Sequence, residues 1–198
     1  LNFVALLLVG EVLEDGGLGE AGAGFPQSPL LPRDAWLPRL MPRTDLHAGV
    51  LLAVLAAIIA HGVLWRMRWG FAIRTAGASR RAARYAGLSL PRTVMGLMLG
   101  AGATAGLAGA VQVQGIHHRL IDGFTGGFGF VAVAIALLGG LNPLALIPAA
   151  LLFGLLETGA LSMQRQVGVP SSLVAVIEGM AMLFVLAITA RNRAAARV

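Results

Sequence analysis

Lysine and cysteine are both absent from this chain of 198 residues, and charged residues are scarce. Without lysine the chain cannot contain the phosphate-binding loop of a P-loop ATPase, which requires that side chain. Without cysteine it has no disulfide framework, no thiolate nucleophile and no sulfur-ligated zinc site. Only 12% of the residues are charged and 57% are hydrophobic, whereas soluble domains have about 25% charged residues. The composition therefore predicts an integral membrane protein.

The sequence opens with an apolar stretch, residues 1–9, and has neither an initiator methionine nor the basic segment that begins a signal peptide. As a helix it would reach only about 14 Å, while the hydrocarbon core of a membrane needs about 20 residues. We therefore interpret it as the end of a helix and expect the sequence to be the C-terminal part of a larger protein. Residues 10–45 combine acidic residues with five prolines and are predicted to form a long external loop.

Three further apolar stretches, residues 46–65, 94–113 and 173–190, predict membrane helices. Trp65 ends the first of them, where an interfacial aromatic residue belongs. Residues 66–92 contain seven arginines and no acid, and three arginines without an acid follow the last stretch. Because short arginine-rich segments stay on the cytoplasmic side, this loop and the C-terminus are predicted to be cytoplasmic.

Two shorter apolar stretches, residues 128–141 and 144–156, flank Asn142 and Pro143. Each reaches roughly 20 Å as a helix, which is too short to span a bilayer comfortably. Because residue 114 and the start of the last helix are both predicted outside, the two stretches must enter and return. We expect a hairpin of short, tilted or re-entrant helices within an all-α polytopic bundle that forms one transmembrane domain over residues 1–198.

Residues 79–87 of the basic loop contain the signals of a short helix. Ser79 is a suitable N-cap, Gly87 is suitable for the C-terminal turn, and Arg80 and Arg84 are four residues apart on one face. Such arginines could simply set topology and contact anionic lipid head groups. The alanines between them would let a groove of another protein approach the backbone closely. A docking helix is therefore the second interpretation.

Short motifs run from the basic loop to the C-terminal part of the chain: Gly70, Ile73-Arg74, Gly77, residues 82–87, 105–109, 127–130 and 134–139, Pro143, Phe153-Gly154, Gly159-Ala160, Met163-Gln164 and Gly168-Val169-Pro170. Together they resemble the integral-membrane permeases of ABC importers for nucleosides and simple sugars, which are related to branched-chain amino acid permeases. The resemblance covers nearly the whole chain, and it implies that the N-terminal helices of the usual permease are missing here.

The resemblance implies a coupling helix in the cytoplasmic loop of residues 66–92, which fits a cleft on a separate ATPase subunit and transmits its closure to the membrane helices. The residues that take this role are Gly77, Arg80, Arg81, Ala82, Ala83, Arg84, Tyr85 and Gly87. It also implies a second permease subunit, an extracytoplasmic substrate-binding protein and the inner membrane of a prokaryote. Nucleosides are the first expected cargo and simple sugars the second.

Three polar residues are candidates for lining a translocation pathway: Gln112, Asn142 and Glu178. Inserting an ionisable group into a membrane costs at least about 2.5 kcal/mol, so Glu178 should face a pathway or pair with an arginine such as Arg165. Gln112 and Asn142 are also typical of helix ends that meet water. The adjacent His117 and His118 have no third ligand at zinc-site spacing and are expected to be solvated.

Two other classes of protein stay open at this stage. An ion-coupled secondary transporter would also contain broken helices at membrane depth. An intramembrane enzyme would need paired catalytic groups, and Glu157 and Glu178 are the only carboxylates in or beside the C-terminal membrane helices. No reaction links these two residues. The sequence predicts no catalytic residue, no cofactor, no metal site and no nucleic-acid surface.

Overall fold

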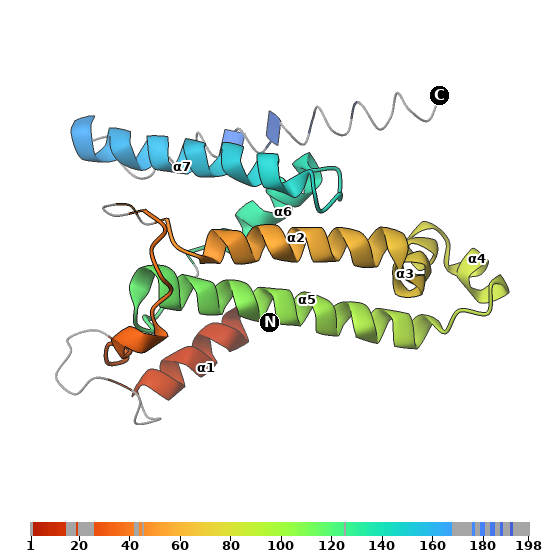
Figure 1. Ribbon diagram of the computed structural model, residues 1–198, viewed down its shortest axis with the longest axis horizontal. Helices are drawn as coiled ribbons and strands as arrows, with labels where there is room; N and C mark the ends of the chain where they lie inside the picture. Colours follow the sequence, from red (N-terminus) through yellow and green to blue (C-terminus); the bar gives the residue numbers. More distant parts are fainter. Residues whose placement is uncertain are drawn as a thin grey trace. The chain divides into compact units, whose positions relative to one another are not determined.

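The computed structural model describes residues 2–14, 19, 26–41, 44, 46–124 and 126–167, and single positions beyond them (176, 179, 180, 183, 184, 187 and 191). Within these residues the regular structure is helical, with only two isolated β-bridges, so the all-α prediction is confirmed (Figure 1). The chain forms two compact units, one of Leu1–Ala56 with Leu64–Gly126, the other of Ala57–Val63 with Gly127–Val198.

Among the described residues, three helices are long and apolar enough to cross a membrane: Gly49–Arg66, Leu90–His117 and Leu146–Gln166. In the most apolar 18-residue stretch of each helix, only 6%, 0% and 11% respectively is buried within the molecule. Exposed leucines and isoleucines along them, such as Leu55, Ile58 and Leu155, would be unfavourable in water. Their apolar surfaces therefore require lipid or further helices around them.

The first unit contains α1 (Asn2–Glu14), the two ends of α2 (Gly49–Arg66) and α5 (Leu90–Gln112), which continues as the π-helical turn η2 (Val113–His117). Residues 57–63 of α2 belong to the second unit. α1 extends to residue 14 and so enters the segment predicted to be loop. α2 begins where the Gly49 amide donates to His47 Nδ1 at 3.1 Å. It ends where Met67 turns to extended backbone. Pro91 lies in the first turn of α5, where its missing N–H costs no hydrogen bond.

Residues 26–37 of the predicted external loop pair with residues 114–122. The Ser28 amide donates to the Leu120 carbonyl at 2.8 Å, and the Leu31 amide donates to the His118 carbonyl at 2.9 Å. Apart from the end of α1 and the 3-10 turn η1 (Arg33–Ala35), the described residues of this loop form no helix. Backbone hydrogen bonds to a distant segment order it instead.

The second unit contains the helices on either side of the predicted turn. α6 (Phe128–Leu138) is short, as expected, and packs against α7 (Leu146–Val167). The prediction that the second arm is also too short to span is wrong, because α7 has 22 residues and thus a length of about 33 Å. Its helix continues beyond Leu156 through the polar residues Glu157 and Thr158.

The turn between α6 and α7 is set by backbone conformation. Gly140 has a φ of 63°, the Gly140 amide donates to Leu137, and the Leu141 amide donates to Ala136, which is the Schellman pattern of a helix end. A side chain at Gly139 would lie 3.2 Å from the backbone of Leu146. The chain therefore reverses tightly at this point.

Candidate functional site

The basic loop folds into two helices that follow α2 and precede α5. α3 (Arg68–Ala78) packs on α5, and α4 (Arg80–Tyr85) packs on both. Trp69 of α3 fits against Gly96 of α5, where any side chain in place of the glycine would clash with the indole ring. Figure 1 shows α3 and α4 together at the end where α2 finishes and α5 begins. The loop is thus a folded structure anchored on a membrane helix.

Ser79 separates α3 from α4 and caps both. Its amide donates to the Thr75 carbonyl at 3.0 Å and closes α3. Its backbone is extended, and its side-chain oxygen accepts from the Ala82 amide at 3.3 Å. This is the N-cap geometry that the sequence predicted, and it satisfies a donor that the first turn of α4 would otherwise leave open.

Gly87 ends α4 as predicted. Its φ is 70°, its amide donates to Arg84, and the Leu88 amide donates to Ala83, each at 3.0 Å. These two bonds form a Schellman motif, which needs a left-handed residue at the position of Gly87. α4 is therefore fixed at both ends by the two capping residues that the sequence predicted, Ser79 and Gly87.

The side chains of α4 divide into an inner and an outer face. Ala83 is completely buried, while Tyr85 is 86% exposed. Arg80, Arg81 and Arg84 are exposed, as is Ala82. The outer face can contact a partner, whereas Ala83 supports the helix from within. Gly77, in the last turn of α3, is also exposed.

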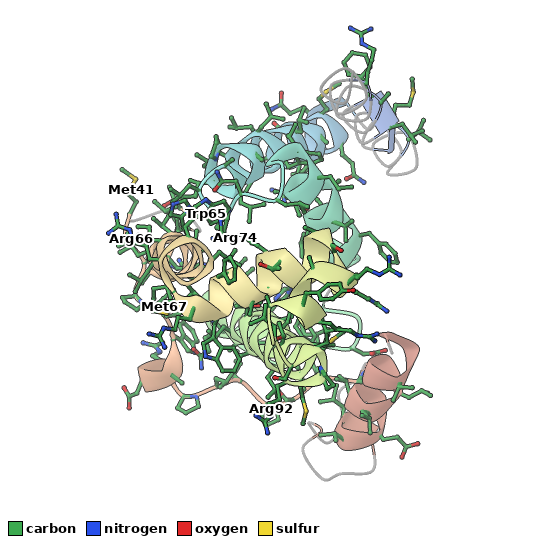
Figure 2. The ribbon with its side chains drawn as sticks, turned by 90° about the vertical axis from the view of Figure 1, so that its right-hand side faces the viewer. Met41, Trp65, Arg66, Met67, Arg74 and Arg92 are labelled. Atoms are coloured by element: carbon green, nitrogen blue, oxygen red, sulfur yellow. The ribbon has the colours of Figure 1, made fainter. Side chains whose placement is uncertain are left out.

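A contact that sequence reasoning missed joins α2 to α3. The Arg74 guanidinium carbon lies 5.3 Å from the centre of the Trp65 ring, in cation–π geometry, and Arg74 Nε donates to the Gly70 carbonyl at 3.4 Å. Figure 2 shows Arg74 beside Trp65 at the junction of these helices. The aromatic position at the end of the apolar stretch was visible in the sequence, but its arginine partner nine residues later was not.

The structure places two of the three predicted pathway residues, and they lie in different units. Gln112 is half-buried at the end of α5, in the first unit. Asn142 lies in the second unit, where its Oδ1 accepts from the Leu144 amide at 3.2 Å, so its side chain stabilises the turn. Glu178 lies outside the described residues.

His117 and His118 were predicted to be solvated, and that prediction is wrong. His118 is only 9% exposed. Its ring stacks on Trp36 with centroids 3.9 Å apart and planes 10° apart, and its Nδ1 lies 3.0 Å from the Gln114 carbonyl oxygen. His117 is half-buried. No group of three potential metal ligands occurs within the part of the chain that the structure describes.

Long, lipid-compatible helices joined by a folded basic loop define a multi-pass membrane protein. The chain matches the family described as "Branched-chain amino acid transport system / permease component" over residues 1–186, and it belongs to that family. The resemblance seen in the sequence is thereby confirmed. The family description is that of the permease component of a transport system.

Curated relatives specify the class of permease further. The chain is 38% identical to the guanosine ABC transporter permease of Bacillus subtilis over 154 residues, which cover 77% of this chain and 44% of the relative. It is 34% identical to the glucose ABC transporter permease of Haloferax volcanii over 196 residues, covering 94% of this chain and 51% of the relative. A nucleoside ABC transporter permease of Lactococcus lactis is 35% identical over 154 residues, covering 77% and 42%.

The chain thus spans about half the length of the curated relatives it matches. No solved structure matches it.

Proposed function

We propose that the full-length protein is the permease subunit of an ABC importer that carries nucleosides, or alternatively simple sugars, across the cytoplasmic membrane of a prokaryote. Two of the relatives described above transport nucleosides and one transports glucose by name. The observation that carries the proposal is α4, a short helix capped at both ends, with arginines exposed between two membrane helices.

In this function α4 is the coupling helix. Its outer face, with Arg80, Arg81 and Arg84, contacts the ATPase subunit on the cytoplasmic side. Ala83 and its neighbours in α3 and α5 transmit the movement of α4, because a rigid packed unit moves as a whole. A second permease subunit and an extracytoplasmic binding protein complete the transporter, and Glu178 with Gln112 and Asn142 are the proposed pathway residues.

Reconstituted transport tests this function. Full-length permease, its ATPase and its binding protein are placed in proteoliposomes with labelled guanosine, glucose or leucine. We expect guanosine uptake that requires ATP on the ATPase side and no ion gradient. Uptake driven by a sodium or proton gradient alone would indicate a secondary transporter. ATP-driven uptake of leucine without guanosine or glucose would indicate a branched-chain amino acid permease instead.

A further inference from the structure

The junction of α2 and α3 combines arginines with exposed aromatic and apolar side chains. Arg66, Arg68 and Arg74 are exposed here, together with Trp65 at 44% and Trp69 at 59% exposure. We call these five residues the junction surface. Figure 2 shows Trp65, Arg66 and Arg74 grouped at the end of α2. No acidic residue occurs anywhere in residues 66–92, so the loop itself supplies no counter-ion.

Arg74 is held in a defined orientation within the junction surface. The Trp65 ring lies against its guanidinium, and Nε is engaged by the Gly70 carbonyl, itself part of a buried residue. Its two terminal nitrogens make no hydrogen bond to any residue in the described part of the chain. A guanidinium fixed at one edge presents its other donors as a fork, which matches the oxygens of a phosphate group.

The position of the junction surface along the chain determines what it meets. Trp65 and Arg66 are the last two residues of the membrane-spanning helix α2. Tryptophan at the end of a span lies at the level of the lipid head groups, and arginine beside it reaches the phosphates. Met67 and Phe71, both more than half exposed, place further apolar surface next to the arginines. This amphipathic combination fits the boundary between hydrocarbon and head groups better than it fits a soluble partner.

We propose that the junction surface binds the phosphate head group of an anionic phospholipid, with Arg74 as its oriented donor and Arg66 and Arg68 as supporting charges. The arginines of the loop then have two tasks. The arginines of α2 and α3 contact lipid. The arginines of α4, which follow the N-cap Ser79, are left to contact a protein partner. This inference does not depend on the proposed transport function.

Lipid retention by the full-length permease tests the proposal. Protein equilibrated in mixed micelles with equal amounts of phosphatidylglycerol and phosphatidylcholine is analysed by native mass spectrometry. We expect phosphatidylglycerol to be retained about five-fold or more over phosphatidylcholine, since each basic residue near a membrane surface favours anionic lipid. Equal retention of the two lipids would overturn the proposal.

Two triple variants locate the site. They are matched because each removes three exposed positive charges, one set from the junction surface and the other from α4. Arg66→Gln, Arg68→Gln and Arg74→Gln together should abolish the preference, while Arg80→Gln, Arg81→Gln and Arg84→Gln together should preserve it. Arg74→Lys keeps the charge but not the fork, and should reduce the preference by part of that amount. An equal loss in both triple variants would mean a general charge effect and would overturn the site.

A soluble competitor separates lipid from simple phosphate. Glycerol 3-phosphate carries the same phosphate chemistry without acyl chains, so it should not displace phosphatidylglycerol when present at equal concentration. Displacement by this competitor would show a phosphate site that does not require the membrane, and would contradict the lipid assignment. The melting temperature of each variant is measured in parallel. It should match that of the unsubstituted protein for the variant at Arg80, Arg81 and Arg84, whose side chains are exposed, and should fall only slightly where Arg74 loses its contact with Trp65.

Discussion

Gly87 and Gly77 lie near α4 and were both assigned to coupling, yet their backbones differ. Gly87 has a φ of 70° and closes the Schellman turn. Gly77 lies within the last turn of α3, and no atom would contact a side chain added there. Glycine is therefore needed for its conformation at Gly87, while alanine is compatible with the backbone at Gly77.

The substitution Gly87→Ala should weaken the end of α4. An alanine in the left-handed region costs about 1–2 kcal/mol, so the hydrogen bonds of residues 86–88 should open more often. Amide hydrogen exchange of this segment, followed by mass spectrometry, should become at least about five-fold faster.

Gly77→Ala is the matched control for that substitution. Alanine stabilises a helix interior by about 0.5–1 kcal/mol relative to glycine, so exchange in α3 should slow. If the two variants changed exchange in the same direction, the role given to the φ of Gly87 would be wrong.

Residue-scale prediction succeeded where the cause is local. Ser79 and Gly87 were assigned from their own chemistry, and both are observed in those roles. The burial of Ala83 could not be inferred in the same way, because it depends on how α3 and α5 pack around α4. In the sequence, Ala82 and Ala83 are equivalent alanines.

At the scale of the element, α4 offers a test that separates docking from folding. Ala82 is exposed and Ala83 is completely buried, although they are adjacent. Ala82→Trp should leave the melting temperature in detergent nearly unchanged and block co-purification of the ATPase, because the indole adds bulk to the outer face. Normal ATPase co-purification with this variant would remove α4 from the coupling interface.

Ala83→Trp should act through the fold instead. No space exists for an indole between α4 and its supporting helices, and overpacking of this kind typically costs about 1–3 kcal/mol. We expect a lowered melting temperature together with any loss of docking. An unchanged melting temperature would contradict the packing of α4 against α3 and α5.

The length of α7 illustrates what apolar patterning does not reveal. Counting apolar residues ended this helix at Leu156, because Glu157 and Thr158 follow. Hydropathy predicts which residues face lipid, whereas helix continuation depends on backbone bonding and propensity. The Thr158 hydroxyl donates to the Gly154 carbonyl at 2.8 Å, so this polar group is satisfied within the helix. Glutamate, glutamine, arginine and methionine are also good helix formers, and they occupy the segment that follows.

At the scale of the whole molecule, the orientation in the membrane stays a prediction that cysteine labelling can check, since the chain has no cysteine of its own. Tyr85 is 86% exposed and Leu30 is 57% exposed. We expect Tyr85→Cys to react with a membrane-impermeant maleimide only from the cytoplasmic side, and Leu30→Cys only from outside. Reaction of both from one side would contradict the crossing of α2.

Leu30 is a better reporter than the neighbouring serine. The Ser28 hydroxyl accepts from the Leu120 amide at 2.9 Å, so replacing it would disturb the loop that is being probed. The unsubstituted protein, whose residues 1–198 contain no cysteine, gives the background for both measurements.

The ordered loop could not be predicted from local sequence. Prolines and acidic residues indicated little regular structure, and that is correct for its described part apart from the end of α1 and one 3-10 turn. Its pairing with residues 114–122 orders it, and residues paired in this way, such as Gln27 and Arg119, are 92 residues apart. No local pattern encodes such a distance, and the burial of His118 against Trp36 depends on it.

Because of this long-range pairing, the first segment must remain unpaired during synthesis until the second segment has been made. Residues 26–37 leave the ribosome well before residues 114–122 exist, and at about 5–20 residues per second the interval is on the order of 5–20 s. Throughout that time Ser28 and Leu31 have no backbone partners from the later segment. The unpaired loop is thus accessible to chaperones and proteases until α5 has been made and inserted. Slowed translation between α2 and α5 would prolong this exposure without changing any residue of the finished protein.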